Sequence, residues 1–202
     1  FDDAMEAVRT RLSQALQLPP GAGVVLMPSG TDAEYIPLAI AQQLYPDAPV
    51  RSVLAANGET GSGGLNACGA EYFDAVVPLE QQLQREAGAS LEGFPPVAVR
   101  TIAARDADGA VVDAAAAMEG LSWPDATAEE PVWVLRSVLG SKTGFSTSRL
   151  SVDSSARVIE VADLCQMRKP LADIDAALSS EAVLLLTGSK FFQGSAFSSA
   201  VV

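Results

Sequence analysis

The 202-residue sequence contains no histidine and only two cysteines. Without histidine, the chain lacks the catalytic systems in which a histidine activates a serine or a cysteine, and it lacks histidine-ligated metal sites. The two cysteines, Cys68 and Cys165, are far apart and form no Cys-x-x-Cys pair, which argues against a disulfide framework and against a zinc cluster. We therefore expect no bound metal and a reducing, cytoplasmic location.

Positive charge is also scarce, because 13 Lys and Arg residues stand against 25 Asp and Glu residues, for a net charge of −12. A chain this acidic repels a phosphate backbone, so we expect no nucleic-acid partner. No apolar run approaches the roughly 18 residues that cross a bilayer, and no basic-then-apolar signal segment opens the chain, so we expect no membrane partner. The sequence begins at Phe1 and stops within an apparent strand, and we expect it to be a segment of a longer protein.

Short apolar runs alternate with polar loops and helical stretches, a pattern typical of an α/β protein with a largely parallel sheet. Several runs are apolar on consecutive positions, as expected for strands covered by helices on both faces. We predict a three-layer α/β/α domain with a mostly parallel seven-stranded sheet. The predicted strands are 24–27, 51–55, 97–103, 132–138, 158–162, 183–186 and 196–202. The predicted helices are 2–18, 31–45, 79–86, 113–121 and 171–178, the second of them kinked or divided by Pro37.

Ligands of parallel sheets bind where strands end, so the loops after the predicted strands are the candidate sites. The first loop contains Ser29, Gly30 and Thr31. Thr31 and Glu34 fit a capping box that begins a helix, whose free N–H groups would bind a phosphate. Capping alone also explains these residue types, so both interpretations stay open.

The second loop, 57–64, is rich in glycine. It is not a dinucleotide fingerprint, because Gly61 and Gly63 would require a third glycine where Asn66 stands. It is either an active-site loop that a ligand approaches closely or a plain surface turn. The third loop, 139–144, places two hydroxyls, Ser141 and Thr143, at the same sheet edge, although a simple turn also accounts for it.

The last two loops carry charged residues directly after apolar strands. Asp163 is expected to be partly desolvated and to need a partner that favours its charged form, such as a cationic ligand nitrogen. Glu160, inside the same strand, would be an awkward core residue, and exposure at an edge is the alternative. Lys190 precedes two phenylalanines and is expected to be shielded from solvent, which would prepare it for Schiff-base chemistry. A lysine that snorkels from a strand end is the alternative.

The order of these loops resembles that of fold type I pyridoxal-phosphate-dependent enzymes, the aspartate aminotransferase superfamily. The likeness is closest to the class V aminotransferase and cysteine desulfurase branch, where Asp-x-x-Gln precedes Ser/Thr-x-x-Lys. Here these pairs are Asp163 with Gln166 and Thr187 with Lys190. The resemblance implies that residues 1–202 form the large domain, which binds pyridoxal 5'-phosphate, and that the small C-terminal domain lies outside this segment.

The resemblance also implies residue roles. Lys190 would hold the cofactor as a lysine aldimine and move protons at the substrate α-carbon. Asp163 would pair with the pyridine nitrogen, so that the ring withdraws electrons. Gln166 would donate a hydrogen bond to the phenolic oxygen, together with Ser141. The phosphate would be held by Ser29, Gly30, Thr31 and Thr187.

Members of the class V branch stack a histidine on the cofactor ring, and here Glu59 or Thr60 would face the ring instead. Arg168 has two interpretations: a contact with substrate or phosphate, and an ion pair with neighbouring acids, which we expect. The resemblance implies an amino-acid substrate, transamination as the leading reaction and a homodimer. The alternatives are a pyridoxal-phosphate-dependent lyase or decarboxylase and a non-catalytic α/β binding module.

Overall fold

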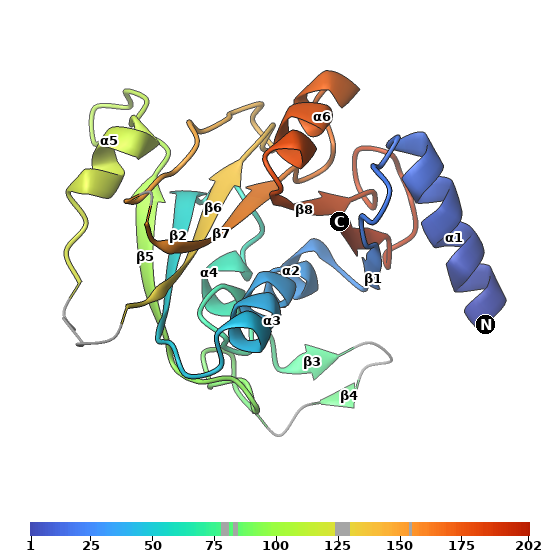
Figure 1. The fold of residues 1–202 in the computed structure, drawn as a ribbon, viewed down its shortest axis with the longest axis horizontal. Helices are drawn as coiled ribbons and strands as arrows, with labels where there is room; N and C mark the ends of the chain where they lie inside the picture. The colour runs from blue at the N-terminus through green and yellow to red at the C-terminus, as the bar shows by residue number, and fades with distance from the viewer. Residues whose placement is uncertain (78–80, 83–84, 124–129, 154) are drawn as a thin grey trace.

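A computed structural model describes residues 1–77, 81–82, 85–123, 130–153 and 155–202. Its main feature is a seven-stranded sheet with the order β1-β9-β8-β7-β6-β2-β5 (Figure 1). Strand β9 runs antiparallel to its two neighbours, β1 and β8, and the other neighbouring strands are parallel, so the sheet is mixed and mostly parallel. The strands are β1 Val25–Met27, β2 Val50–Asn57, β5 Val97–Ala103, β6 Val132–Val138, β7 Arg157–Asp163, β8 Val183–Thr187 and β9 Ser199–Val201. The predicted α/β class is therefore confirmed.

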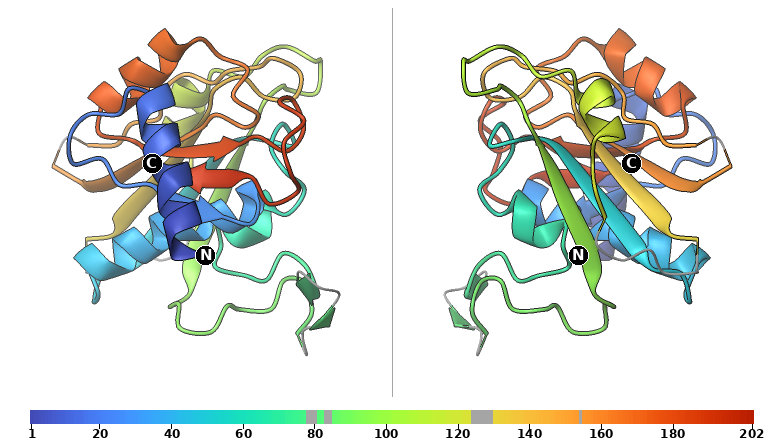
Figure 2. Two further views of the ribbon diagram at one scale, coloured as in Figure 1. Left: turned by 90° about the vertical axis from the view of Figure 1, so that its right-hand side faces the viewer. Right: turned by 90° about the vertical axis from the view of Figure 1, so that its left-hand side faces the viewer.

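Helices cover both faces of the sheet because the strands are apolar on both faces. Within β8, Leu185 packs in one core cluster with Leu38, whereas Leu184 packs in another with Ile174 on the opposite face. The first face carries α2 Gly30–Ala33 and α3 Tyr35–Leu44, and the second carries α5 Ala114–Glu119 and α6 Leu171–Ser179 (Figures 1 and 2). Residues adjacent in a strand thus belong to different cores.

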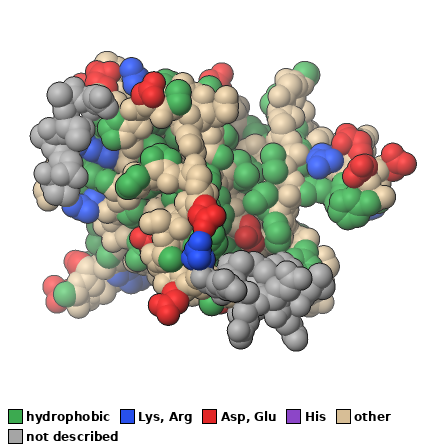
Figure 3. Space-filling model, turned by 90° about the horizontal axis from the view of Figure 1, so that it is seen from below, with side chains coloured by type: hydrophobic (Ala, Val, Ile, Leu, Met, Phe, Trp, Pro, Cys, Tyr) green, Lys and Arg blue, Asp and Glu red, His purple; other side chains and the backbone are tan. Residues whose placement is uncertain are grey.

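Helix α1, Asp2–Ala15, lies beside β1 at one end of the sheet, and none of its residues is buried. It projects from the rest of the molecule and carries acidic side chains near the N-terminus (Figure 3). Its contact with the body comes from its C-terminal end, where Leu16 is buried in the same cluster as Ile174. No helix among the described residues is long and apolar enough to cross a membrane.

The predicted helix 31–45 is divided, as expected, but the division falls at Glu34 rather than at Pro37. Pro37 lies in the first turn of α3, where the missing N–H costs the helix nothing. A short helix after the glycine-rich loop, α4 Gly64–Ala67, was not predicted.

The predicted helix 79–86 is wrong where it can be compared with the structure. Residues Gln81–Gln82 form strand β4, which pairs antiparallel with β3 Val76–Val77 in a hairpin that projects from the body (Figure 2). Residues 78–80 and 83–84 lie outside the described part of the chain. The segment is rich in Leu, Gln and Glu, and their helix propensity is a weak preference that a pairing strand overrides.

Candidate active site

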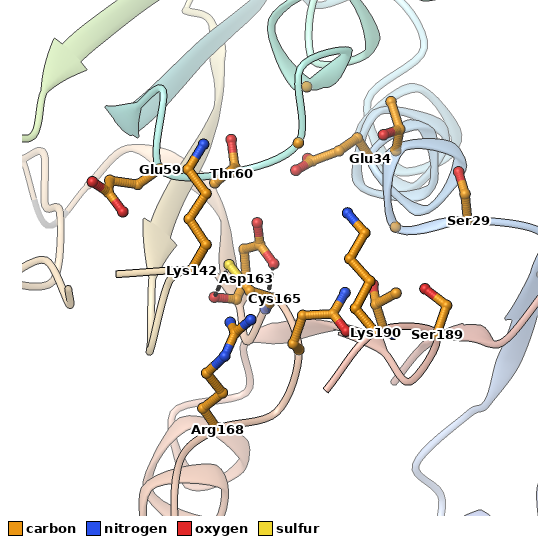
Figure 4. A pocket seen from close by; sticks show the side chains of 16 residues that line it. Ser29, Glu34, Glu59, Thr60, Lys142, Asp163, Cys165, Arg168, Ser189 and Lys190 are labelled. Carbon is orange, nitrogen blue, oxygen red and sulfur yellow. Dashed lines mark hydrogen bonds between the residues drawn. The ribbon is translucent and has the colours of Figure 1, made fainter. Parts of the chain in front are cut away.

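A cavity of about 240 Å³ lies at the carboxyl ends of the parallel strands (Figure 4). Its walls are the loops that follow β1, β2, β6, β7 and β8, so segments distant in sequence meet at one edge of the sheet. The predicted cofactor-binding residues that line it are Ser29, Gly30, Thr31, Thr60, Asp163, Gln166, Thr187 and Lys190. Ser141 is the predicted residue that does not line the cavity.

Ser141 is buried behind the wall. Its hydroxyl donates a 2.6 Å hydrogen bond to Glu59 Oε2, and the Thr143 hydroxyl donates another at 2.8 Å. These two hydrogen bonds are the main reason that the pKa of Glu59 lies below its usual value. Ser141 therefore does not face the cavity itself. Its hydrogen bond positions the carboxylate of Glu59, which lines the cavity.

The loop after β1 begins α2, but with a different cap from the one predicted. Ser29 is the N-cap: its Oγ accepts the Asp32 N–H at 3.1 Å and donates to Asp32 Oδ2 at 2.6 Å. The expected capping box of Thr31 and Glu34 is wrong, because Ser-x-x-Asp satisfies the same pattern two residues earlier. The side chains of Thr31 and Glu34 are thereby left for other contacts.

Gly30 and Thr187 bring the loops after β1 and β8 into close contact. A Cβ placed on Gly30 would lie 2.5 Å from Thr187 Oγ1, closer than non-bonded atoms approach. Only glycine therefore lets the Thr187 hydroxyl reach the start of α2, where backbone N–H groups are free of helical partners. The result is a cradle of hydroxyl and N–H donors.

The glycine-rich loop closes over this cradle. A Cβ on Gly61 would lie 3.2 Å from Thr31 Oγ1, and a Cβ on Gly63 would lie 2.9 Å from Thr31 Cγ2 and 2.8 Å from Phe73 Cβ. Thr60 and Gly61 line the cavity. Close backbone approach, rather than a plain surface turn, is thus the reason for at least two of these glycines.

Asp163 ends β7 and is 9% exposed. Its Oδ1 accepts the Cys165 N–H at 2.7 Å, within a tight turn in which Cys165 has a positive φ of 48°. Burial, followed by the nearby charge of Glu34, raises the pKa of Asp163 to about 7. The hydrogen bond from Cys165 and the charge of Arg136 oppose this rise only in part. Asp163 therefore sits in the desolvated position expected from the sequence.

Gln166 joins the loops that carry Asp163 and Lys190. Its Oε1 accepts two backbone N–H groups, that of Lys190 at 2.9 Å and that of Phe191 at 3.0 Å. The Gln166 side chain is buried, so these hydrogen bonds are protected from water. Both acceptor sites of the amide oxygen are thereby used, so the amide NH₂ is the group with which Gln166 can donate a hydrogen bond into the cavity.

Lys190 lines the cavity, and Figure 4 shows its side chain extending inward toward Glu34. The expectation that it is shielded by the two aromatics is wrong, because Lys190 is exposed and Phe191 and Phe192 are 57% and 58% exposed. The physical reason is that β8 ends at Thr187 and a loop follows, which turns both rings outward instead of packing them over the lysine.

A buried ion pair that the sequence analysis missed lies beneath the cavity. Arg136 is fully buried in β6, and its Nε donates to Glu34 Oε2 at 2.6 Å. Two further bonds, to the Glu34 carbonyl at 3.1 Å and to Ser52 Oγ at 2.7 Å, complete its contacts. Burial raises the pKa of Glu34, and Arg136 opposes that rise. An arginine within the mostly apolar run 132–138 was the available signal.

Two other charged residues have contacts that the sequence did not specify. Glu160 is not a core residue, because its side chain is 25% exposed and pairs with Arg149. Arg168 was expected to pair with acids, and it forms no ion pair with any described carboxylate. Instead, its Nη1 donates to the Ser141 carbonyl at 3.1 Å, and its guanidinium lies 5.5 Å from the ring centre of Phe191.

Among the described residues, no group of three or more Cys, Asp or Glu side chains is placed to hold a metal ion. The chain matches no protein-family model, no curated protein and no solved structure.

Proposed function

We propose that the chain is the cofactor-binding domain of a pyridoxal-phosphate-dependent enzyme that acts on an amino acid, with transamination as its leading reaction. The observation that carries the proposal is that Lys190 and Asp163 line one cavity with the cradle of Gly30, Thr31 and Thr187. A carbonyl-reactive amine, a desolvated carboxylate and an anion cradle are the three groups such a cofactor needs. In the sequence they lie as much as 160 residues apart, taking Gly30 and Lys190.

The cradle supports the phosphate end of this proposal. Hydroxyls and free helix N–H groups bind a phosphate without cationic side chains, which suits a chain of net charge −12. The space also fits, because about 300–1,000 Å³ is typical for drug-sized ligands, and a cavity of about 240 Å³ suits a single-ring cofactor. The Ser29 hydroxyl is engaged with Asp32, so Thr31 and Thr187 are the hydroxyls available there.

Asp163 supports the part of the proposal that concerns the pyridine ring of the cofactor. A buried carboxylate with a pKa near 7 gains its charge readily when a cationic nitrogen enters beside it. The charged carboxylate then stabilises the protonated form of that nitrogen. When bound, the cofactor supplies an electron sink for bonds at the substrate α-carbon. Lys190 supplies the amine that holds it and the base that moves the proton.

The sequence makes the test unusually clean, because it contains only three lysines: Lys142, Lys169 and Lys190. We expect the protein mixed with pyridoxal phosphate to show the visible absorption band of lysine-bound cofactor, and borohydride reduction followed by peptide mass analysis to place the label on Lys190. Lys190→Ala should abolish the band. Lys142→Ala, in the same cavity, and Lys169→Ala, beside Asp173, are matched controls that should retain it.

A band that persists in Lys190→Ala, or a label on Lys142, would overturn the assignment of Lys190. No band in the wild type would favour a non-catalytic binding module. Once the band is established, screening of amino donors with separate detection of keto acid, carbon dioxide and amine would distinguish transamination from lyase or decarboxylase chemistry.

A further inference from the structure

Three carboxylates line the cavity, those of Glu34, Glu59 and Asp163, and the proposed function uses only Asp163. The Glu59 carboxylate is held at the wall by the hydroxyls of Ser141 and Thr143. Glu34 differs from Glu59 because it is buried, and it reaches the cavity from the point where α2 ends and α3 begins. A second buried carboxylate in the cavity of Asp163 therefore requires an explanation of its own.

Arg136 fixes the position of the Glu34 carboxylate. Its Nε donates to Glu34 Oε2 at 2.6 Å and its Nη2 donates to the Glu34 carbonyl at 3.1 Å, so the side chain and the backbone are both held. The arginine is anchored in turn, because its Nη1 donates to the Ser52 hydroxyl at 2.7 Å. All three residues are buried. The charge of Glu34 therefore has a fixed place that is protected from solvent.

The other oxygen of the Glu34 carboxylate is open to the cavity. Arg136 bonds Oε2, and no described residue donates a hydrogen bond to Oε1. Within the described part of the chain, no fully enclosed side-chain nitrogen or oxygen lacks a partner, so Oε1 is reached from the cavity that Glu34 lines. In Figure 4 the Asp163 carboxylate is directed toward Glu34. The two acids thus meet in one cavity.

Two carboxylates in one buried cavity disfavour each other's charge, because repulsion is strong where water is excluded. Burial raises the pKa of Glu34 as well as that of Asp163. Arg136, however, cannot lose its proton, and a neutral Glu34 would leave that buried cation unpaired. Glu34 therefore stays charged, and the proton is held by Asp163.

The other ionisable groups near Asp163 do not account for this division. Burial raises the pKa of the thiols of Cys68 and Cys165, so both stay neutral near pH 7. The remaining charged groups that line the cavity are Glu59, Lys142, Arg168 and Lys190, from the loops after β2, β6, β7 and β8. Glu34 is the charged group with the largest effect on the pKa of Asp163.

We infer that Glu34 is a positioning residue that acts through Asp163: its charge, fixed by Arg136, keeps a proton on Asp163 in the cofactor-free protein. Asp163 then becomes charged only when a cation enters beside it, so no uncompensated negative charge is buried before that. The control of Asp163 by Glu34 is a property of the chain alone. Its use for the ring nitrogen of pyridoxal phosphate rests on the proposed function.

The test follows the titration of Asp163 in the cofactor-free protein by nuclear magnetic resonance. Aspartate labelled with carbon-13 at the side-chain carboxyl is incorporated, so that the glutamate carboxyls, including that of Glu34, give no signal. The resonance that Asp163→Asn removes is assigned to Asp163. Its chemical shift is recorded from about pH 4 to about pH 9, and we expect a wild-type pKa of about 7.

Glu34→Gln removes the charge but leaves an amide oxygen for Arg136, and we expect it to lower the pKa of Asp163 by about one unit or more. Glu34→Asp keeps the charge and should restore most of the wild-type value. Glu59→Gln is the matched control, because it removes a carboxylate from the same cavity, and it should leave the titration unchanged.

A second variant keeps the test decisive if Glu34→Gln does not fold. Glu34→Gln combined with Arg136→Met removes both partners of the ion pair, so no buried charge is left unpaired. The pKa of Asp163 should still fall in this double variant, because the charge of Glu34 affects Asp163 more than the charge of Arg136 does.

An Asp163 pKa that stays at the wild-type value without Glu34, or that falls equally in Glu59→Gln, would overturn the inference. A wild-type value near the ordinary 3.8 would also overturn it. These outcomes leave the proposed function standing, since that function is tested by the visible band on Lys190. A wild type without the band would overturn the proposed function, and the titration of Asp163 would still decide the role of Glu34.

Discussion

Arg136 and Glu34 form a buried ion pair at the cavity wall, with Nε and Oε2 2.6 Å apart and both side chains 4% exposed or less. The arginine is satisfied by Glu34 on two sides and by Ser52 on a third. Glu34 also lines the cavity, and its charge raises the pKa of Asp163. The pair therefore links the stability of the sheet to the charge state of the site.

Removing the arginine should be costly because it leaves a buried carboxylate unpaired. We expect Arg136→Met to lower the free energy of unfolding by about 3–5 kcal/mol, measured by urea denaturation. Arg149→Gln, which breaks the exposed pair with Glu160, is the control and should cost no more than about 1 kcal/mol. Similar losses in the two variants would show that the buried pair does not stabilise the fold in this way.

The raised pKa of Asp163 predicts a pH dependence of stability. A carboxyl that titrates near 3.8 when unfolded and near 7 when folded holds its proton more tightly in the folded state. Stability should therefore fall as pH rises from about 4 to about 7, by on the order of 4 kcal/mol at most, and change little from this group above pH 7. Urea unfolding of the cofactor-free protein across this range, compared with Asp163→Asn, isolates the effect. A variant that keeps the wild-type slope would contradict the assignment.

Replacement of Gly30 is predicted to destabilise the protein for steric reasons. Gly30→Ala places a Cβ 2.5 Å from Thr187 Oγ1, and the resulting strain should cost about 1–3 kcal/mol of stability. Gly23→Ala is the matched control, because nothing lies within 4 Å of a Cβ there. The double variant Gly30→Ala with Thr187→Ala should recover part of the loss in a mutant cycle. Purely additive effects would place the strain elsewhere.

The pattern of apolar and polar residues along the chain was sufficient to predict the layers of the fold. The strands 97–103 and 132–138 were predicted with the bounds that the structure has, because each is a short run rich in β-branched and aliphatic residues that follows a proline. The prediction of a helix over 79–86 was wrong at Gln81–Gln82, which form a strand. A short polar segment of good helix formers has no periodic apolar face, so its sequence does not distinguish a helix from a hairpin. Local pattern specifies an element only where it also specifies what the element buries.

The order of the loops could be predicted from the sequence, because the start of a helix after the first strand, the glycine-rich loop, Asp163 and Lys190 are each local features. Tertiary structure alone decided that these loops line one cavity, that Ser141 acts through Glu59, and that Lys190 is exposed. It also paired Arg136 with Glu34, 102 residues away. Such contacts depend on strand order across the sheet, and strand order is set by packing between distant segments, which no local pattern contains.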